Sequence, residues 1–466
     1  MPQLIERPES VQINAYDGTG TLTSDLPSRT PWGQRQKDQS ITRFLGPAVA
    51  ADLRDWQHPE VGWGVILPDD DSVPIEARAR GEDAHPAIQK LLAHRSGAPV
   101  LRWREEFGQD YLRRYYVDGR FHDLSAAAIK PGVQDGHIPR YLLIVAGPQA
   151  IPWSVQYALN MSTFVGRVEP SEMLSAYVDA LIDDWAGFEC HPEWPVVWSV
   201  NHGRPDITNL MQRAIADILW SKFAADPEFK GERIENQLAT RENLCAALIE
   251  RSPGLVITTS HGTTGPTSDA QRLKRQLGLP VDANYTSLNL ADLANWKPAG
   301  AIWYAHACCS AGSDSTTRYE GLLPEDSSIS RMLANVASTA KAMIAPLALS
   351  LIGAVAPLRA FVGHVEPTFD WTLRDPANGQ GVTHALCTAL YDNLYQPDRR
   401  TPIGYALRGI FSEAGAYYGA VRNAIEGINN NVPGMRDHAL YNRLVAMDRQ
   451  TTVIIGDPTV SLPRPT

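Results

Sequence analysis

The chain is poor in cysteine and has no excess of positive charge. Five of its 466 residues are cysteine, an odd number without metal-ligand spacing. This favours free thiols in a reducing compartment over a disulfide framework or a zinc site. The net charge of −10 argues against nucleic acid as the main partner, because binding phosphates requires a basic face. It is compatible with a basic peptide or protein substrate.

Long apolar runs are also missing. The nearest, residues 342–362, is interrupted by Pro346, Pro357 and Arg359, so no segment matches a membrane span. The first residues lack the basic start and apolar stretch of a secretory signal. We therefore expect a cytoplasmic protein without membrane contact. At 466 residues the chain exceeds one typical core, so two or three lobes are expected.

Two apolar runs in the middle of the chain each lead into a reactive side chain. Residues 255–259 are followed by His261, and residues 301–305 are followed by Cys308. Both runs are β-branched or aromatic and are bounded by small residues, which predicts buried strands of a parallel sheet. Side chains at the carboxyl ends of such strands converge on one crevice. The sequence therefore predicts that His261 and Cys308 lie close together.

This arrangement contains the parts of a thiol-based catalyst. Cys308 can attack a carbonyl, and His261 can carry a proton to the leaving amine. Gly262 has no Cβ, so its N–H can approach the substrate and hold the oxyanion together with the N–H of Cys308. Taken singly, a buried cysteine is usually a small hydrophobe, and it is the joint pattern that favours catalysis. No metal or organic cofactor is required.

A His-Gly pair after one apolar block and the Ala307-Cys308 pair after the next resemble the caspase-like cysteine peptidases, which include caspases, legumains, gingipains, separases and CHAT-domain proteases. Segments 141–152 and 453–458 are similar to the gingipain and CHAT end of this superfamily. The resemblance covers roughly residues 140–466. It implies an α/β three-layer sandwich, with helices flanking a mostly parallel sheet, and a His–Cys dyad.

Two choices within this pattern stay open. Many relatives read Ala-Cys-x-x-Gly, and counting back from Gly312 selects Cys309 as the nucleophile. We favour Cys308, because it directly follows the small residue of the motif. His364, on a later apolar strand, competes with His261 as the base, but its order relative to the cysteine is wrong for the family. His202 precedes a glycine like His261, and we interpret it as a non-catalytic copy or a chance match.

The sequence suggests three regions: residues 1–135 as an N-terminal α/β region, 136–250 as a non-catalytic caspase-like lobe, and 251–466 as the catalytic lobe. Tandem lobes are what the resemblance to gingipains implies. In the first region, residues 103–116 predict a helix. Residues 69–71 are three adjacent aspartates, which we interpret as a solvated turn, because three adjacent acids cannot all point at one cation.

Two charged segments near the dyad have alternative interpretations. Arg272, Lys274 and Arg275 form a basic run that is either a cleavable or partner-binding loop or, as we favour, a solvated helix face. Asp314 lies in a polar loop after the cysteines. It would either hold a basic substrate side chain or cap the next helix, and we favour the cap.

The sequence thus predicts an intracellular cysteine endopeptidase that cleaves a protein or peptide substrate. Such an enzyme needs restraint, so we expect control by a protein partner, a regulatory ligand or autocleavage. The resemblance to CHAT-type proteases implies bacterial antiviral defence as one setting. Two alternatives remain open: a catalytically inactive caspase-like scaffold that binds a protein partner, and a binder of basic peptides without hydrolysis.

Overall fold

The computed structural model describes residues 10–16, 21–25, 51–322, 327–375, 378–396 and 398–464. The chain divides into two compact units, Met1–Ala50 and Ala51–Thr466. The described part of the first unit is a hairpin in which strand β1 (Ser10–Tyr16) pairs antiparallel with β2 (Thr21–Asp25). The rest of that unit, and with it the start of the predicted N-terminal region, lies outside the described residues.

The second unit alternates strands and helices along the chain. Its strands are β3 (Trp63–Pro68), β4 (Val100–Trp103), β5 (Tyr111–Tyr115), β6 (Phe121–Ser125), β7 (Tyr141–Val145), β8 (Phe164–Val168), β9 (Val196–Ser199), β10 (Glu232–Glu235), β11 (Leu255–Thr259), β12 (Ile302–His306), β13 (Gly312–Ser313), β14 (Met343–Ile344), β15 (Ala360–His364) and β16 (Thr452–Gly456). Its helices are α2 (Ile75–Arg80), α3 (Pro86–His94), α4 (Trp153–Asn160), α5 (Leu174–Ile182), α6 (Ile207–Met211), α7 (Asp217–Ala225), α8 (Arg241–Arg251), α9 (Ala270–Gln276), α10 (Ser328–Ala340), α11 (Pro346–Ile352), α12 (His384–Thr388), α13 (Ile403–Ala406), α14 (Arg408–Asn429) and α15 (Met435–Gln450).

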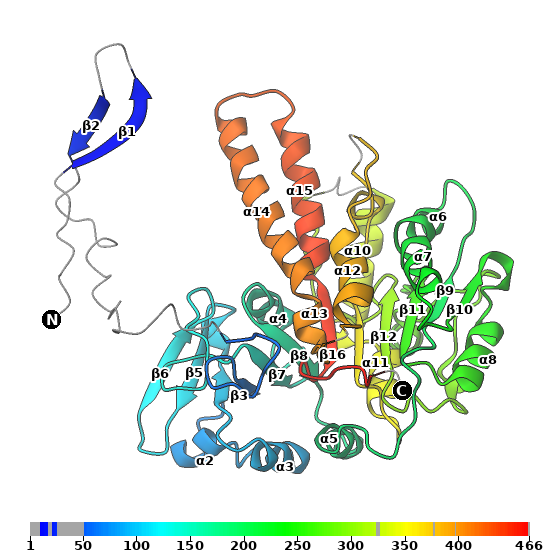
Figure 1. The fold of residues 1–466 in the computed structure, drawn as a ribbon, viewed down its shortest axis with the longest axis horizontal. Helices are drawn as coiled ribbons and strands as arrows, with labels where there is room; N and C mark the ends of the chain where they lie inside the picture. Colours follow the sequence, from blue (N-terminus) through cyan, green and yellow to red (C-terminus); the bar gives the residue numbers. More distant parts are fainter. Residues whose placement is uncertain are drawn as a thin grey trace. The chain divides into compact units, whose positions relative to one another are not determined.

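One sheet of 12 strands runs through the second unit, in the order β10-β9-β11-β12-β15-β16-β8-β7-β3-β4-β5-β6. Its pairings are parallel except at β15/β16, β4/β5 and β5/β6. Because β16 is antiparallel to β15 and parallel to β8, the two parallel halves of the sheet run in opposite directions. The carboxyl ends of β11 and β12 therefore lie at the edge opposite to those of β3 and β7 (Figure 1).

The central strands are buried on both faces. Every residue of β11, β12 and β15 is buried, as expected for parallel strands that are covered by helices on each side. This burial explains why the sequence shows continuous apolar runs instead of an alternating pattern. The predicted α/β class with a mostly parallel sheet is confirmed.

The three predicted regions all contribute to this sheet. Strands β9 and β10 come from region 136–250 and extend the sheet beside β11 of the predicted catalytic lobe. Strand β8, from the same region, pairs with β16 near the end of the chain. The division into a non-catalytic and a catalytic lobe remains a prediction.

The helix predicted for residues 103–116 is wrong. That segment contains the end of β4, a short 3₁₀ turn at Glu105–Phe107 and strand β5, which lies between β4 and β6. In β5, Leu112 and Tyr115 are buried while Tyr111 is exposed. Charged residues in β5 pair with β6 instead of lining a helix: Arg113 donates from Nε to Asp123 at 2.6 Å.

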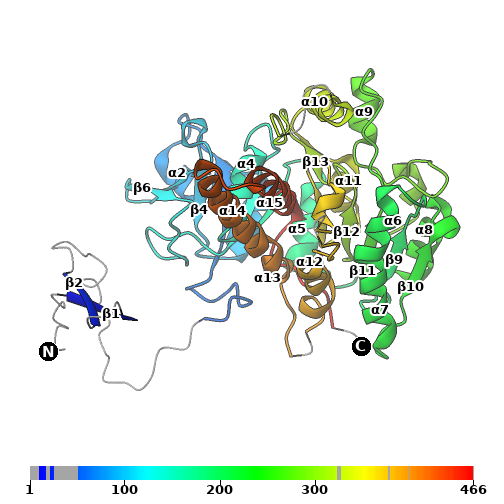
Figure 2. The ribbon, with the colours of Figure 1, turned by 90° about the horizontal axis from the view of Figure 1, so that it is seen from above.

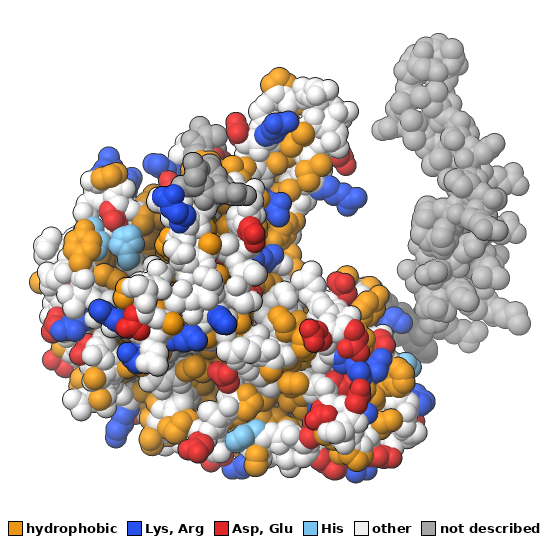
Figure 3. Space-filling view, turned by 180° about the vertical axis from the view of Figure 1, so that it is seen from behind, with side chains coloured by type: hydrophobic (Ala, Val, Ile, Leu, Met, Phe, Trp, Pro, Cys, Tyr) orange, Lys and Arg blue, Asp and Glu red, His pale blue; other side chains and the backbone are white. Residues whose placement is uncertain are grey.

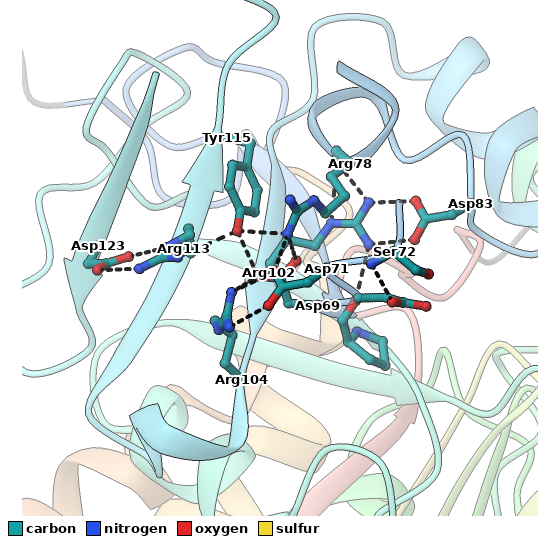
Figure 4. A network of polar contacts seen from close by, with 12 residues as sticks. Asp69, Asp71, Ser72, Arg78, Asp83, Arg102, Arg104, Arg113, Tyr115 and Asp123 are labelled. Atoms are coloured by element: carbon teal, nitrogen blue, oxygen red, sulfur yellow. Dashed lines mark hydrogen bonds and ion pairs between the residues drawn. The ribbon is translucent and has the colours of Figure 1, made fainter. Parts of the chain in front are cut away.

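The acidic turn at Asp69–Asp71 belongs to an ion-pair network (Figure 4). Arg78 donates to Asp69 at 3.0 Å and to Asp71 at 2.8 Å, and Arg104 donates to both carboxylates from the other side. The solvated turn was predicted correctly for the exposed Asp71 but not for Asp69, whose side chain is buried. Guanidinium groups therefore occupy the positions that a cation would need.

Helices α14 and α15 form a long hairpin that stands out from the sheet (Figure 1). On the face shown in Figure 3, acidic and basic side chains are interspersed. None of the helices in the described ranges combines the length and the apolar character that crossing a bilayer requires.

Candidate active site

Four neighbouring strands end at the edge that carries the predicted dyad. Strand β11 pairs in parallel with β12, with Thr259 opposite His306. His261 and Cys308 follow directly after this pair, so the parallel register places both at the same edge. Strands β9 and β15 flank this pair, also in parallel, and the loops that follow them reach the same place.

The backbone after His261 lies against the backbone of Cys308. A Cβ built on Gly262 would overlap the carbonyl oxygen of Cys308, so no side chain fits there. The backbone N–H groups of Thr368 and Gly262 favour negative charge on the Cys308 sulfur and so act to lower the pKa of its thiol. Gly262 therefore lies directly beside Cys308, and its role toward an oxyanion stays a prediction.

Burial raises the pKa of the Cys308 thiol above its ordinary value, and the N–H groups of Thr368 and Gly262 only partly offset this effect. The residue is half-buried by its accessible surface. No hydrogen bond joins His261 to the sulfur in the described structure. The free protein therefore holds Cys308 as a neutral thiol, a resting state without the ion pair of an activated cysteine.

Cys309 turns away from this edge into the core. It has a φ of 55°, which is uncommon for a residue with a side chain. Its side chain packs in an apolar cluster between α9 and α10, which lie side by side (Figure 2). Burial raises the pKa of its thiol well above the ordinary value. Of the two adjacent cysteines, Cys308 is the one with solvent access.

A carboxylate that the sequence analysis did not select orients His261. The Nε2 atom of His261 lies 3.1 and 3.0 Å from the two carboxylate oxygens of Asp206. Asp206 is also the N-cap of α6, where it accepts from the N–H and the hydroxyl of Thr208. Burial alone would raise the pKa of Asp206, but the hydrogen bonds from Thr208 and His261 outweigh burial and lower it.

His202 belongs to the same edge because β9 is the neighbour of β11. Its ring is nearly parallel to that of His261, with centroids 5.8 Å apart, and it stacks on Tyr285 at 3.9 Å. Burial lowers the pKa of His202, which keeps its imidazole neutral. The His-Gly pair interpreted as a copy or a chance match therefore lies within the site.

His364 occupies a different environment. It is buried on β15 with its ring 4.9 Å from that of His306, and neither of its ring nitrogens has a hydrogen-bond partner in the described structure. Burial lowers the pKa of both histidines. These observations describe a neutral core histidine and offer no support for the competing base.

Asp314 does not cap the next helix. Its carboxylate accepts from the N–H of the adjacent Ser315 at 2.7 Å, and α10 is capped by Ser327, which accepts from the N–H of Ser330. The favoured prediction of a helix cap is wrong. Burial raises the pKa of Asp314. Its role toward a basic substrate side chain stays a prediction.

Glu366 joins the loop after the cysteines to the loop after β15. One carboxylate oxygen accepts from the N–H of Arg318 at 2.9 Å, and the other accepts from the hydroxyl of Thr317 at 3.2 Å. Burial raises its pKa to about 7. Thr368 follows closely in the chain, and its N–H lowers the pKa of the Cys308 thiol, so this carboxylate helps to hold a loop that acts on the sulfur.

The described residues contain no cluster of three or more histidine, cysteine, aspartate or glutamate side chains that could hold a metal ion. In sequence, the chain matches no protein-family model and no curated protein.

We predict that Gly262→Ala destabilises the fold by about 1–3 kcal/mol, because the new methyl group overlaps the Cys308 carbonyl. Urea unfolding measures the difference. Gly265→Ala in the same loop is the matched control, since a Cβ built there meets no described atom within 4 Å apart from those of its chain neighbours. Equal stability of both variants would contradict the close approach of the two backbones.

We predict that Glu366→Gln stabilises the protein at pH 8 but not at pH 4. The folded state raises the pKa of Glu366 from 4.5 to about 7, so it binds the proton more tightly than the unfolded chain does. Stability is therefore lost as the pH rises between these values, by about 3 kcal/mol. The test is the free energy of unfolding at pH 4 and at pH 8, measured for the wild type, for Glu366→Gln and for the exposed control Glu320→Gln. If Glu366→Gln were more stable than the wild type at pH 4 alone, the prediction would be wrong.

Proposed function

We propose that the protein is a cysteine endopeptidase in which Cys308 is the nucleophile and His261 the general acid and base. The contact between the Gly262 and Cys308 backbones at the shared strand edge is the observation that carries the proposal. This contact places the N–H groups of Gly262 and Cys308 close together beside the thiol, which supports a site where they and the imidazole of His261 act on one carbonyl group.

The hydrogen bond to Asp206 assigns the roles of the two imidazole nitrogens. A carboxylate only accepts, so Nε2 of His261 carries the hydrogen and Nδ1 is free to exchange protons. Nδ1 takes the proton of the Cys308 thiol as the sulfur attacks the scissile carbonyl carbon. The negative charge of Asp206 stabilises the imidazolium that forms.

The tetrahedral intermediate then collapses. The N–H groups of Gly262 and Cys308 hold the oxyanion, and the imidazolium gives its proton to the leaving amine as the C–N bond breaks. A thioester remains on Cys308. Water, deprotonated by Nδ1 of His261, attacks the thioester, and the thiol leaves with the peptide acid. Each proton that is taken is returned, so neither a cofactor nor a metal takes part.

The neutral thiol of the free protein supports the proposal that the enzyme is inactive until a further event activates it. Its pKa is raised by burial and no hydrogen bond reaches it from His261, so binding must first draw the imidazole toward the sulfur. Catalytic hydrogen bonds often tighten only in the substrate complex. A regulatory partner, a ligand or autocleavage would act on this step. A role in bacterial antiviral defence in the cytoplasm rests on the resemblance to CHAT-type proteases.

The same neutral thiol also supports a second candidate function, that of a scaffold that binds a protein partner without cleaving it. The two candidates differ in product formation. A scaffold would bind equally well with or without Cys308, whereas a peptidase would lose cleavage while it retains binding.

We predict that the wild type and Cys309→Ala cleave a mixed peptide library, and that Cys308→Ala and His261→Ala do not. Mass spectrometry identifies the products and the residues on each side of the cut. Cys309→Ala is the matched control, because it removes a neighbouring thiol that points into the core. An active Cys308→Ala with an inactive Cys309→Ala would assign the nucleophile to Cys309, and no cleavage by any form would favour the scaffold.

We predict that Asp206→Asn lowers kcat/KM by about a hundredfold or more, because the charge that stabilises the imidazolium is lost. Asparagine retains the helix cap, so unfolding should change little. The loss should appear in kcat and leave KM nearly unchanged, because the carboxylate acts on the charge that forms during the reaction and not on substrate binding. An unchanged kcat would contradict the role assigned to Asp206.

A further inference from the structure

A cavity of about 920 Å³ opens beside the candidate active site. It lies between the first turn of α8, the exposed side of α9 and the loop 285–290. Three of its lining residues are arginines: Arg241, Arg272 and Arg275. We call it the α9 cavity.

Two of these arginines carry uncompensated charge. Arg241 is paired with Glu242 at 2.8 Å and lies 3.6 Å from Asp292. Arg272 donates from Nε to the side-chain amide oxygen of Gln276. Among the described residues, no carboxylate lies within ion-pair distance of Arg272 or Arg275. Both are exposed, so their guanidinium groups face the cavity without an internal partner.

The α9 cavity is connected to the catalytic residues in two ways. Thr263, the second residue after His261, lines it. Tyr285 also lines it, and its ring begins the stack of three nearly parallel rings that runs through His202 to His261. An extended peptide advances about 3.3 Å per residue, so a substrate held at Cys308 reaches the cavity within a few residues.

We propose that the α9 cavity binds aspartate or glutamate side chains of the peptide substrate near the scissile bond. This inference rests on the proposed function, because it names the substrate class of the same site. Guanidinium groups match carboxylates in a bidentate geometry. Leu279, Leu288 and Leu290 add an apolar wall for the neighbouring residues of the peptide.

The positive charge of the α9 cavity is opposite in sign to the net charge of the whole chain. A net charge of −10 is compatible with a basic substrate, but exposed charges separated by more than about 8 Å are largely screened at physiological salt. The guanidinium groups of Arg272 and Arg275 are in direct reach of a bound peptide. The structure thus assigns an acidic preference to the site of an acidic protein.

The test uses the full chain with Cys308→Ala, which binds peptide without turning it over. Two fluorescent peptides of one sequence are compared, one with glutamates and one with glutamines at the same positions, and fluorescence anisotropy measures their Kd. We expect the glutamate peptide to bind about tenfold more tightly at low salt, with the preference falling as salt is added. Arg272→Glu with Arg275→Glu should abolish it.

Lys274→Glu is the matched control, because this residue is exposed on the same helix and does not line the cavity. It should retain the preference for glutamate. Equal binding of the two peptides, or an equal loss in the Lys274→Glu control, would overturn the proposal. If glutamate binding depends on Arg272 and Arg275 but no peptide is ever cleaved, the α9 cavity stands as an acidic-peptide site while the peptidase proposal fails.

Discussion

The parallel pairing of β9, β11, β12 and β15 is the constraint on which the candidate site depends. Parallel hydrogen bonding requires all four strands to end at one edge of the sheet. Residues that are distant in sequence, such as Asp206, His261 and Cys308, meet there for that reason alone. The loops that follow the strands then decide which atoms face each other, and a glycine after His261 lets two of these backbones touch.

Close packing at this edge has an electrostatic cost. The contacts that bring the Gly262 backbone to Cys308 also remove water from the sulfur, and burial then raises the thiol pKa. The N–H groups of Thr368 and Gly262 offset part of this increase in pKa, since they favour negative charge on the sulfur. In the proposed mechanism the N–H of Gly262 also donates to the oxyanion, so one donor would act on the sulfur at rest and on the charge that develops during acyl transfer.

Elements that depend on the local sequence pattern could be predicted from the sequence. Contacts that depend on which strands pair with each other could not. The runs that became β11 and β12 are continuous and β-branched, so their strands and the residues beyond them were predictable. The mixed charges of residues 103–116 suggested a helix, yet the segment contains strand β5, whose Arg113 pairs with Asp123 of the neighbouring β6. Asp206 shows only a helix-capping signal in sequence. Its contact with His261 exists because β9 is a neighbour of β11, which no local pattern reveals.

The strand direction reverses at β16, and this reversal determines which strands can contribute side chains to the candidate site. Strands β3, β7 and β8 end at the opposite edge, so their loops cannot supply catalytic side chains by the same route. Helix α4 instead connects the first half of the sheet to the chain around the cysteines. Trp153 donates from its indole N–H to the carbonyl of Ser313 at 2.9 Å and is itself fully buried. This contact fixes the chain just after Cys309, and the fixed chain in turn holds Cys309 in the core and leaves Cys308 at the edge. The first half of the sheet therefore acts on the candidate nucleophile through packing and not through chemistry.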